Sequence, residues 1–150
     1  MLSPSPDDAP SERADLVGPR PRVLIVQADR EIAEDQAFHM RVAGLAPAVV
    51  LDGDDAVDAL ERLAPDAVVA DMATPRLSTA RLIRCAREVR RPPGLIIVAA
   101  DRRQSVQIAL LRKGVEHVLA PPVSAGELLG RLLAELRRRG AGTPHLGSRF

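Results

Sequence analysis

Residues 65–75 read PDAVVADMATP, a short apolar run that ends at an acid and leads into a loop. The four residues before Asp71 are all Ala or Val, a pattern typical of a parallel strand that is buried on both faces. Open α/β sheets place their binding sites just beyond the carboxyl ends of such strands. Asp71 is therefore the first candidate site residue in this chain.

Similar apolar runs occur on both sides of this stretch and alternate with helical patterns. The expected strands are 23–26, 48–51, 67–70, 95–99 and 115–119. A first helix is expected over about 30–43. Apolar residues at helical spacing predict three more helices. They are Ala56, Leu60 and Leu63 in the second, Leu82, Ala86 and Val89 in the third, and Leu128, Leu129, Leu132, Leu133 and Leu136 in the last. Ser124 and Glu127 have the spacing of a capping box at the start of the last helix. Repeated strand–helix units predict an α/β, doubly wound parallel sheet.

Composition limits the function classes. The chain has 150 residues, of which 46% are hydrophobic, enough for one domain with an aliphatic core. A net charge of +1 argues against a strongly electrostatic nucleic-acid binder. The single Cys85 cannot form an internal disulfide, and no run approaches the ~20 apolar residues of a membrane span. Without a signal-peptide pattern at its start, the chain is expected to be cytoplasmic and not bound to a membrane.

The two ends differ from the middle in composition. Residues 1–21 are rich in Pro, Ser and charge, so we expect a disordered N-terminal tail. Residues 140–150 are expected to be a C-terminal tail or the stub of a linker. The folded domain is expected to span 22–139.

Four segments resemble the receiver domain of two-component response regulators, in the right order and at the right spacing. The segments 22–26, 65–75, 94–100 and 114–122 resemble the first strand, the phosphoacceptor loop, the fourth strand and the fifth strand with its following turn. The resemblance runs from about Arg22 to Arg138. It implies a flavodoxin-like (βα)5 fold with sheet order 2-1-3-4-5 and a site between strands 1 and 3.

The resemblance assigns the phosphoacceptor role to Asp71, but most of the partner residues are replaced. The family's magnesium-binding acid pair falls on Gln27 and Ala28, a further acid on Asp29, the hydroxyl residue of strand 4 on Ala99, the switch aromatic on Val118, and the Lys before the strand-5 proline on Pro121. Magnesium requires near-octahedral oxygen ligands, and these residues supply few of them. A phosphoryl group would also lack a cation to neutralise it, unless Arg76 or Arg102 took that role.

We therefore expect a degenerate receiver, or pseudo-receiver, that is not an enzyme and uses no cofactor. Its expected role is that of an interaction module in two-component signalling or a phosphorelay, in control of transcription. The expected partner is another protein or a second copy, through a surface on the fourth helix, fifth strand and fifth helix that includes Val106, Leu110 and Leu111. DNA contact would come only through an output domain that this chain does not contain.

Two alternatives remain open. One is a working phosphoacceptor receiver that is phosphorylated on Asp71 and binds magnesium through Asp29 and Asp71. The other is a small flavodoxin-like enzyme or cofactor binder. Against the latter, the chain has neither a Gly-rich phosphate loop nor aromatic residues for stacking a flavin.

Overall fold

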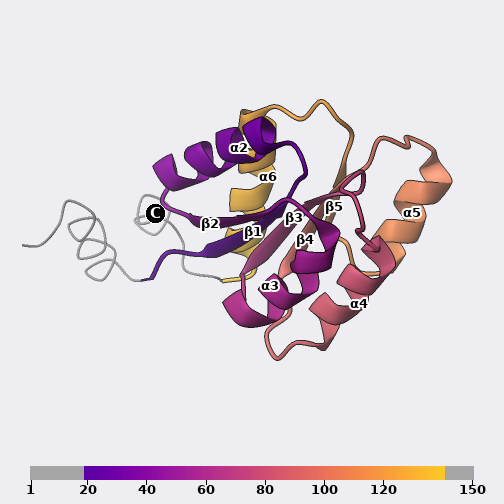
Figure 1. The fold of residues 1–150 in the computed structure, drawn as a ribbon, viewed down its shortest axis with the longest axis horizontal. Coiled ribbons are helices and arrows are strands. Elements are labelled where there is room, and N and C mark those ends of the chain that lie inside the picture. The colour runs from indigo at the N-terminus through magenta and orange to yellow at the C-terminus, as the bar shows by residue number, and fades with distance from the viewer. Residues whose placement is uncertain (1–18, 141–150) are drawn as a thin grey trace, which may run out of the picture.

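The computed structural model describes residues 19–140, which form a five-stranded parallel sheet between two layers of helices (Figure 1). The strands are β1 (Arg22–Val26), β2 (Ala46–Val50), β3 (Ala67–Asp71), β4 (Gly94–Val98) and β5 (His117–Leu119). The helices are α2 (Arg30–Val42), the 3₁₀ turn η1 (Gly53–Asp55), α3 (Ala56–Leu63), α4 (Thr79–Glu88), α5 (Gln104–Arg112) and α6 (Ala125–Arg138). The sheet order β2-β1-β3-β4-β5 confirms the predicted fold. The two predicted tails lie almost entirely outside the described residues.

The alternation of side chains along β1 shows how both helical layers are held. Val23 and Ile25 pack with α2 and α6, whereas Leu24 and Val26 pack with α3, α4 and α5. All four side chains are at most 1% exposed. Because successive residues of a strand face opposite sides of a sheet, a continuous apolar strand can support two layers at once.

Each strand differs from its predicted limits by one or two residues, and two strands begin two residues away from the predicted start. β2 begins at Ala46, two residues early, and it is only partly covered because it lies at the sheet edge. Pro47 lies within β2, which is tolerated because an edge strand does not need every backbone N–H. β5 begins at His117, since the Val115 amide bonds back to Leu110 O at the end of α5.

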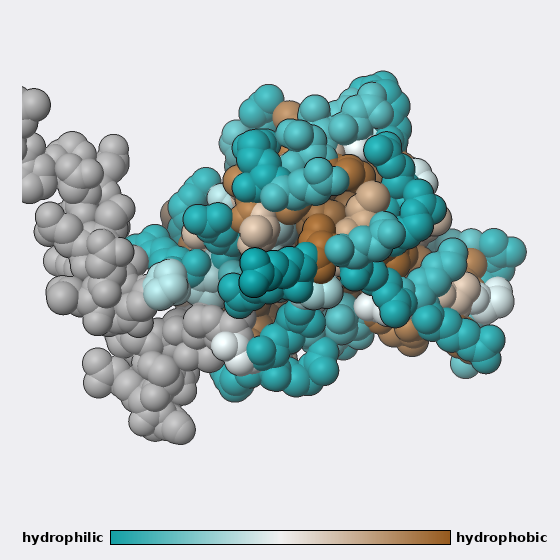
Figure 2. Space-filling view, turned by 90° about the horizontal axis from the view of Figure 1, so that it is seen from below, coloured by the Kyte–Doolittle hydropathy of each residue, from teal (hydrophilic) through white to brown (hydrophobic). Residues whose placement is uncertain are grey.

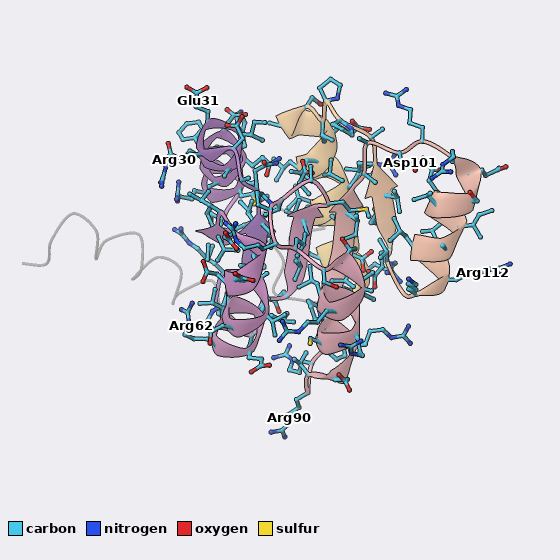
Figure 3. All side chains as sticks on the ribbon, turned by 45° about the vertical axis from the view of Figure 1, so that its right-hand side comes forward. Arg30, Glu31, Arg62, Arg90, Asp101 and Arg112 are labelled. Carbon is cyan, nitrogen blue, oxygen red and sulfur yellow. The ribbon has the colours of Figure 1, made fainter. Side chains whose placement is uncertain are left out.

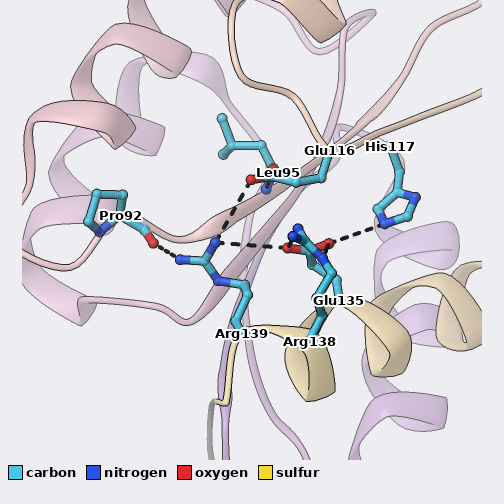
Figure 4. A network of polar contacts seen from close by, with 7 residues as sticks. All are labelled: Pro92, Leu95, Glu116, His117, Glu135, Arg138 and Arg139. Carbon is cyan, nitrogen blue, oxygen red and sulfur yellow. Dashed lines mark hydrogen bonds and ion pairs between the residues drawn. The ribbon is translucent and has the colours of Figure 1, made fainter.

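A polar network joins the end of α6 to the amino ends of β4 and β5 (Figure 4). Glu135 is 1% exposed, and its carboxylate lies 2.6 Å from Arg138 and 3.3 Å from His117 Nε2. Arg139 lies 3.8 Å from Glu135 and from Glu116, and it also donates to Pro92 O. The hydrogen bond that Arg138 donates to the Glu135 carboxylate raises the pKa of Arg138. A buried carboxylate requires such partners to remain charged.

Charged side chains lie around the outer surface of the described residues. Arg90 and Arg112 point away from the body of the molecule (Figure 3). Seen from the side where α3 and α4 lie, hydrophilic residues surround a smaller apolar area (Figure 2). Within residues 19–140, no helix combines the length and hydropathy that a bilayer crossing requires.

Two glycines give a stability test of the α6–β4 contact. A Cβ on Gly94 would lie 2.8 Å from Glu135 Cγ, whereas a Cβ on Gly130 would meet nothing within 4 Å. We expect Gly94→Ala to lower the free energy of unfolding by about 1–3 kcal/mol through overpacking. Gly130→Ala should raise it by about 0.5–1 kcal/mol, because glycine weakens a helix interior. Urea denaturation measures both changes.

A double-mutant cycle links the loss to Glu135. In a Glu135→Ala background, Gly94→Ala should lower the free energy of unfolding clearly less than it does in the wild-type chain. The reason is that Glu135 Cγ, the atom nearest to the new Cβ, is gone. Equal costs in the two backgrounds would contradict the packing of Glu135 on Gly94.

Candidate functional site

The pairing of β1 with β3 sets the position of the site. Val26 is the partner of Ala70 in this parallel pair, so the next residues, Gln27 and Asp71, leave the sheet side by side. On the other side of Gln27, its backbone amide donates to Val50 O of β2 at 3.0 Å. The carboxyl ends of three adjacent strands therefore fix the two residues in space.

Asp71 is partly buried and its carboxylate makes two hydrogen bonds. Oδ2 accepts from Gln27 Nε2 at 3.2 Å, and Oδ1 accepts from the Ala73 backbone amide at 2.8 Å. Both donors are uncharged. The candidate acceptor residue is thus held by the side chain of one neighbouring strand and by the loop that follows its own strand.

The orientation of the Gln27 amide follows from its second partner. Gln27 Oε1 accepts from the Asp29 backbone amide at 2.9 Å, and only the oxygen of a carboxamide can accept from an N–H group. The nitrogen must then face Asp71. Gln27 is 8% exposed, so turning its oxygen toward a cation would break a hydrogen bond in a poorly solvated place.

Asp29 caps a helix. Its Oδ1 accepts from the backbone amides of Glu31 and Ile32, at 3.0 and 3.2 Å, in the first turn of α2. Asp is among the preferred residues at this position, because its side chain satisfies amides that have no partner within the helix. Ala28, between Gln27 and Asp29, is exposed and offers no side-chain ligand.

The remaining predicted positions are occupied by apolar groups. Ala99 is 3% exposed and packs in the core on the α3, α4 and α5 side, and Val118 is half-buried against the same core. The Pro121–Pro122 peptide bond is cis. Thr74 was not singled out from the sequence, yet it is 4% exposed and its hydroxyl donates to Val26 O at 3.5 Å.

Neither Arg76 nor Arg102, the two cations suggested from the sequence, takes the place of the family's lysine. Arg76 pairs with Asp52 and lies 3.6 Å from Asp54, both in the loop after β2. The hydrogen bond from Arg76 lowers the pKa of the Asp52 carboxyl, and the same bond raises the pKa of Arg76. Arg102 is exposed on the loop between β4 and α5.

The side chains around Asp71 do not fit a magnesium ion. Gln27 uses its oxygen on a backbone amide, and Asp29 uses a carboxylate oxygen as a helix cap. Across residues 19–140, no three His, Cys, Asp or Glu side chains come together as a metal-binding group. Magnesium requires near-octahedral oxygen coordination, and these side chains already use oxygen atoms on backbone amides.

Gln27 and Asp71 also line a pocket of about 330 Å³ between α2 and the loop that leads into α6. Its other lining residues are Glu31, Ile32, Asp35, Gln36, Val98, Pro121, Pro122, Val123 and Ala125. Of the eleven lining residues, only Gln27, Asp71 and Pro121 were predicted from the sequence as site positions. Gln36 was not among the predicted site positions, and it lies on the buried face of α2.

The predicted association surface on α5 needs a correction. Leu110 is 6% exposed and packs in the core with Leu82 and Val115, so it cannot belong to an exposed patch. Val106 is partly buried against the same core, whereas Leu111 is 49% exposed. Ile108, at 42% exposure, lies on the exposed part of α5 with Leu111.

Comparison with curated proteins identifies relatives of one kind. The chain is 32% identical over 117 residues to response regulator MprA of Mycobacterium sp. strain KMS, which covers 78% of this chain and 51% of that protein. It is 29% identical over 121 residues to the transcriptional regulatory protein PrrA of Mycobacterium tuberculosis strain H37Rv, covering 81% of this chain and 52% of PrrA. The chain thus spans about half the length of these relatives. No protein-family model matches it.

Solved structures agree with these relatives. The signal receiver domain of a protein named as a Luxo repressor, from Vibrio parahaemolyticus, superposes with a TM-score of 0.75 at 26% identity, covering 81% of this chain and 93% of that domain. The receiver domain of Francisella response regulator 1452 gives a TM-score of 0.73 at 26% identity, covering 79% and 98%. With the sheet order and the position of Asp71, these similarities show that the chain belongs to the receiver domains of two-component response regulators.

Proposed function

We propose that this receiver domain is a pseudo-receiver: a non-catalytic signalling module that acts without magnesium-dependent phosphorylation of Asp71. One observation carries the proposal. The Gln27 amide bonds to Asp71 from the position where the family places a magnesium-binding acid. A neutral donor in this place satisfies the carboxylate without a cation, so the resting state of the site does not depend on a metal.

The surroundings of Asp71 support the same proposal. A phosphoryl group would add nearly two negative charges at the end of β3. Arg76 is engaged with Asp52, Ala99 has no hydroxyl to turn toward the group, and Pro121 has no ammonium. In the alternative of a working phosphoacceptor, Asp29 would bind the metal while its Oδ1 caps α2, and losing that cap would cost about 0.5–2 kcal/mol.

The relatives suggest where such a module acts. Their names, a response regulator and a transcriptional regulatory protein, support a role in transcription control. The cytoplasm remains the proposed location. The receiver would pass its signal by protein contact, and any contact with DNA would be made by an output domain. Self-association through Ile108 and Leu111 of α5 would supply an isologous contact that needs no phosphate. The third reading, a flavodoxin-like enzyme or cofactor binder, has no observation in its favour.

Treatment with acetyl phosphate tests the central point. We expect the wild-type protein to keep its unmodified mass, because the proposed site offers few ligands for the metal and no cation for the phosphoryl group that the transfer requires. Intact-mass spectrometry measures the outcome. The positive control is a receiver domain that has both magnesium-binding acids and the phosphoacceptor Asp. A phosphoryl adduct on the wild-type protein that is absent from Asp71→Ala would overturn the proposal and favour the working phosphoacceptor.

Restoring the acid pair should restore metal binding. Gln27→Asp combined with Ala28→Asp places three carboxylates together with Asp71, so the variant should be less stable than the wild type without metal. Magnesium at roughly ten times its dissociation constant should stabilise this variant by about 1.4 kcal/mol, and it should leave the wild type unchanged. Thermal denaturation with and without magnesium measures both. If magnesium stabilised the wild-type protein as much as this variant, the proposed effect of Gln27 and Ala28 on metal binding would be contradicted.

Self-association should not depend on modification. We expect unmodified protein to sediment as a dimer at high micromolar concentration, and Leu111→Glu to make it monomeric by placing a charge in the contact. Val42→Glu is the control, since Val42 is 73% exposed on α2 and outside this surface. The prediction fails if the wild type is a monomer that only a phosphate mimic converts to a dimer.

A further inference from the structure

The outer side of α4 and the turn after it carry a concentration of positive charge. Five exposed arginines lie there, and we call them the arginine face: Arg81, Arg84, Arg87, Arg90 and Arg91. Glu88 is the only acid between residues 79 and 93. Residues three apart lie on one side of a helix, so Arg81, Arg84 and Arg87 form a single row. Arg90 extends away from the body of the molecule at the end of this row (Figure 3).

No acid of residues 19–140 forms an ion pair with the arginine face. Six arginines on other elements do form such pairs: Arg30, Arg62, Arg76, Arg103, Arg138 and Arg139. Charges of one sign that are grouped without counter-charges produce a local field that attracts an acidic chain. The arginine face therefore has no acidic partner within the described domain, and an acidic segment is the chemistry that fits it.

An apolar pocket lies at the amino ends of the strands, beside Arg22. Its volume is about 190 Å³, and its lining includes Leu24, Ala46, Ala48 and Leu63. Leu24 is the partner of Ala48 in the β1–β2 pair, and Leu24 faces the side of the sheet that α3 covers. An apolar cavity of about 150 Å³ is large enough for a molecule of the size of benzene. A leucine or valine side chain would therefore fit this pocket.

The apolar pocket and the arginine face are close together. Pro65 lines the apolar pocket and also a second pocket, which includes Asp66 and Arg91. Asp66 accepts from the Arg22 backbone amide at 2.8 Å, so the start of β1 lies against the loop between the two pockets. Only β3 separates β1 from β4, which follows Arg91, and two strand spacings amount to about 10 Å. A short segment could contact both places at once.

The residues before β1 have the side chains that fit both places. Residues 1–18 lie outside the described residues, and the described chain begins at Pro19, at this same edge of the sheet. Four acids occur there, Asp7, Asp8, Glu12 and Asp15, against the single Arg13, and Leu16–Val17 follows directly. An extended chain covers at most about 3.6 Å per residue, so the seven residues from Pro19 back to Glu12 can span up to about 25 Å.

We propose that residues 7–17 dock on the amino edge of their own domain, with Leu16–Val17 in the apolar pocket and the acids against the arginine face. This contact requires no regular secondary structure, so it agrees with the composition of the segment. The docked segment would cover the arginine face, and an acidic partner protein would have to displace it. The state of Asp71 plays no part in this inference, which holds or fails separately from the proposed function.

Methyl contacts measured by NMR on the 150-residue chain test the placement directly. We expect nuclear Overhauser effects between the methyl groups of Leu16 or Val17 and those of Ala46, Ala48 or Leu63, because these residues line the pocket. A mixture of labelled and unlabelled chains separates contacts within one chain from contacts between two. The inference is overturned if no such effect is seen, or if the effects arise only between chains and a second copy is the occupant.

The rate of trypsin cleavage tests the role of the apolar pocket. Trypsin cleaves after Lys or Arg unless Pro follows, so Arg13 is its only target in residues 1–21. Ala48→Leu would fill the pocket with a side chain of β2, and we expect cleavage after Arg13 to become about fivefold faster. Val49→Leu is the control, because Val49 lies on the opposite face of the same strand and its change should alter the rate less than twofold.

A matched pair of charge variants tests the arginine face by the same measurement. Arg90→Gln with Arg91→Gln should make cleavage after Arg13 about threefold faster, because both arginines lie near the start of β4. Arg30→Gln with Arg41→Gln removes the same charge from α2, on the other side of the sheet, and should change the rate less than twofold. Intact-mass spectrometry follows the cleavage. A rate that neither Ala48→Leu nor the Arg90 and Arg91 changes increase over their controls would overturn the inference.

Discussion

The parallel register of β1 and β3 is the constraint on which the rest of the site depends. It places Val26 opposite Ala70, so Gln27 and Asp71 leave the sheet together. From there a short series of hydrogen bonds leads from Asp71 to Gln27, from Gln27 to the Asp29 amide, and from the Asp29 side chain to the first turn of α2. A slip of one residue would turn every side chain to the opposite face and separate these groups.

The replacement of an acid by Gln27 changes the electrostatics of this edge of the sheet. Several carboxylates at one place repel each other unless a cation joins them, and their mutual repulsion raises their pKa values. An amide donor removes that conflict and stabilises a single carboxylate without metal. Arg76 is correspondingly engaged elsewhere, with Asp52, where it ties the loop after β3 to the loop after β2.

Much of this arrangement could be predicted from the sequence, and the exceptions have physical reasons. The apolar runs predicted the strands, and the resemblance to receiver domains implied that Gln27 would lie near Asp71. The prediction that Leu110 belongs to an exposed surface was wrong, because one residue corresponds to about 100° around a short helix and Leu111 has the exposed position instead. The cap formed by Asp29 had a sequence signal, an Asp directly before a helix, whereas the missing partner of Gln36 depends on packing that no local pattern contains.

The most direct test of the account is the NMR signal of the Gln27 side-chain amide. If this amide donates to Asp71, its proton and nitrogen chemical shifts should change on Asp71→Ala. Magnesium should leave these shifts unchanged at concentrations that saturate a receiver with both magnesium-binding acids. A Gln27 signal that is insensitive to Asp71→Ala, or that moves in a saturable manner with magnesium, would show that a cation and not the amide is the partner of Asp71.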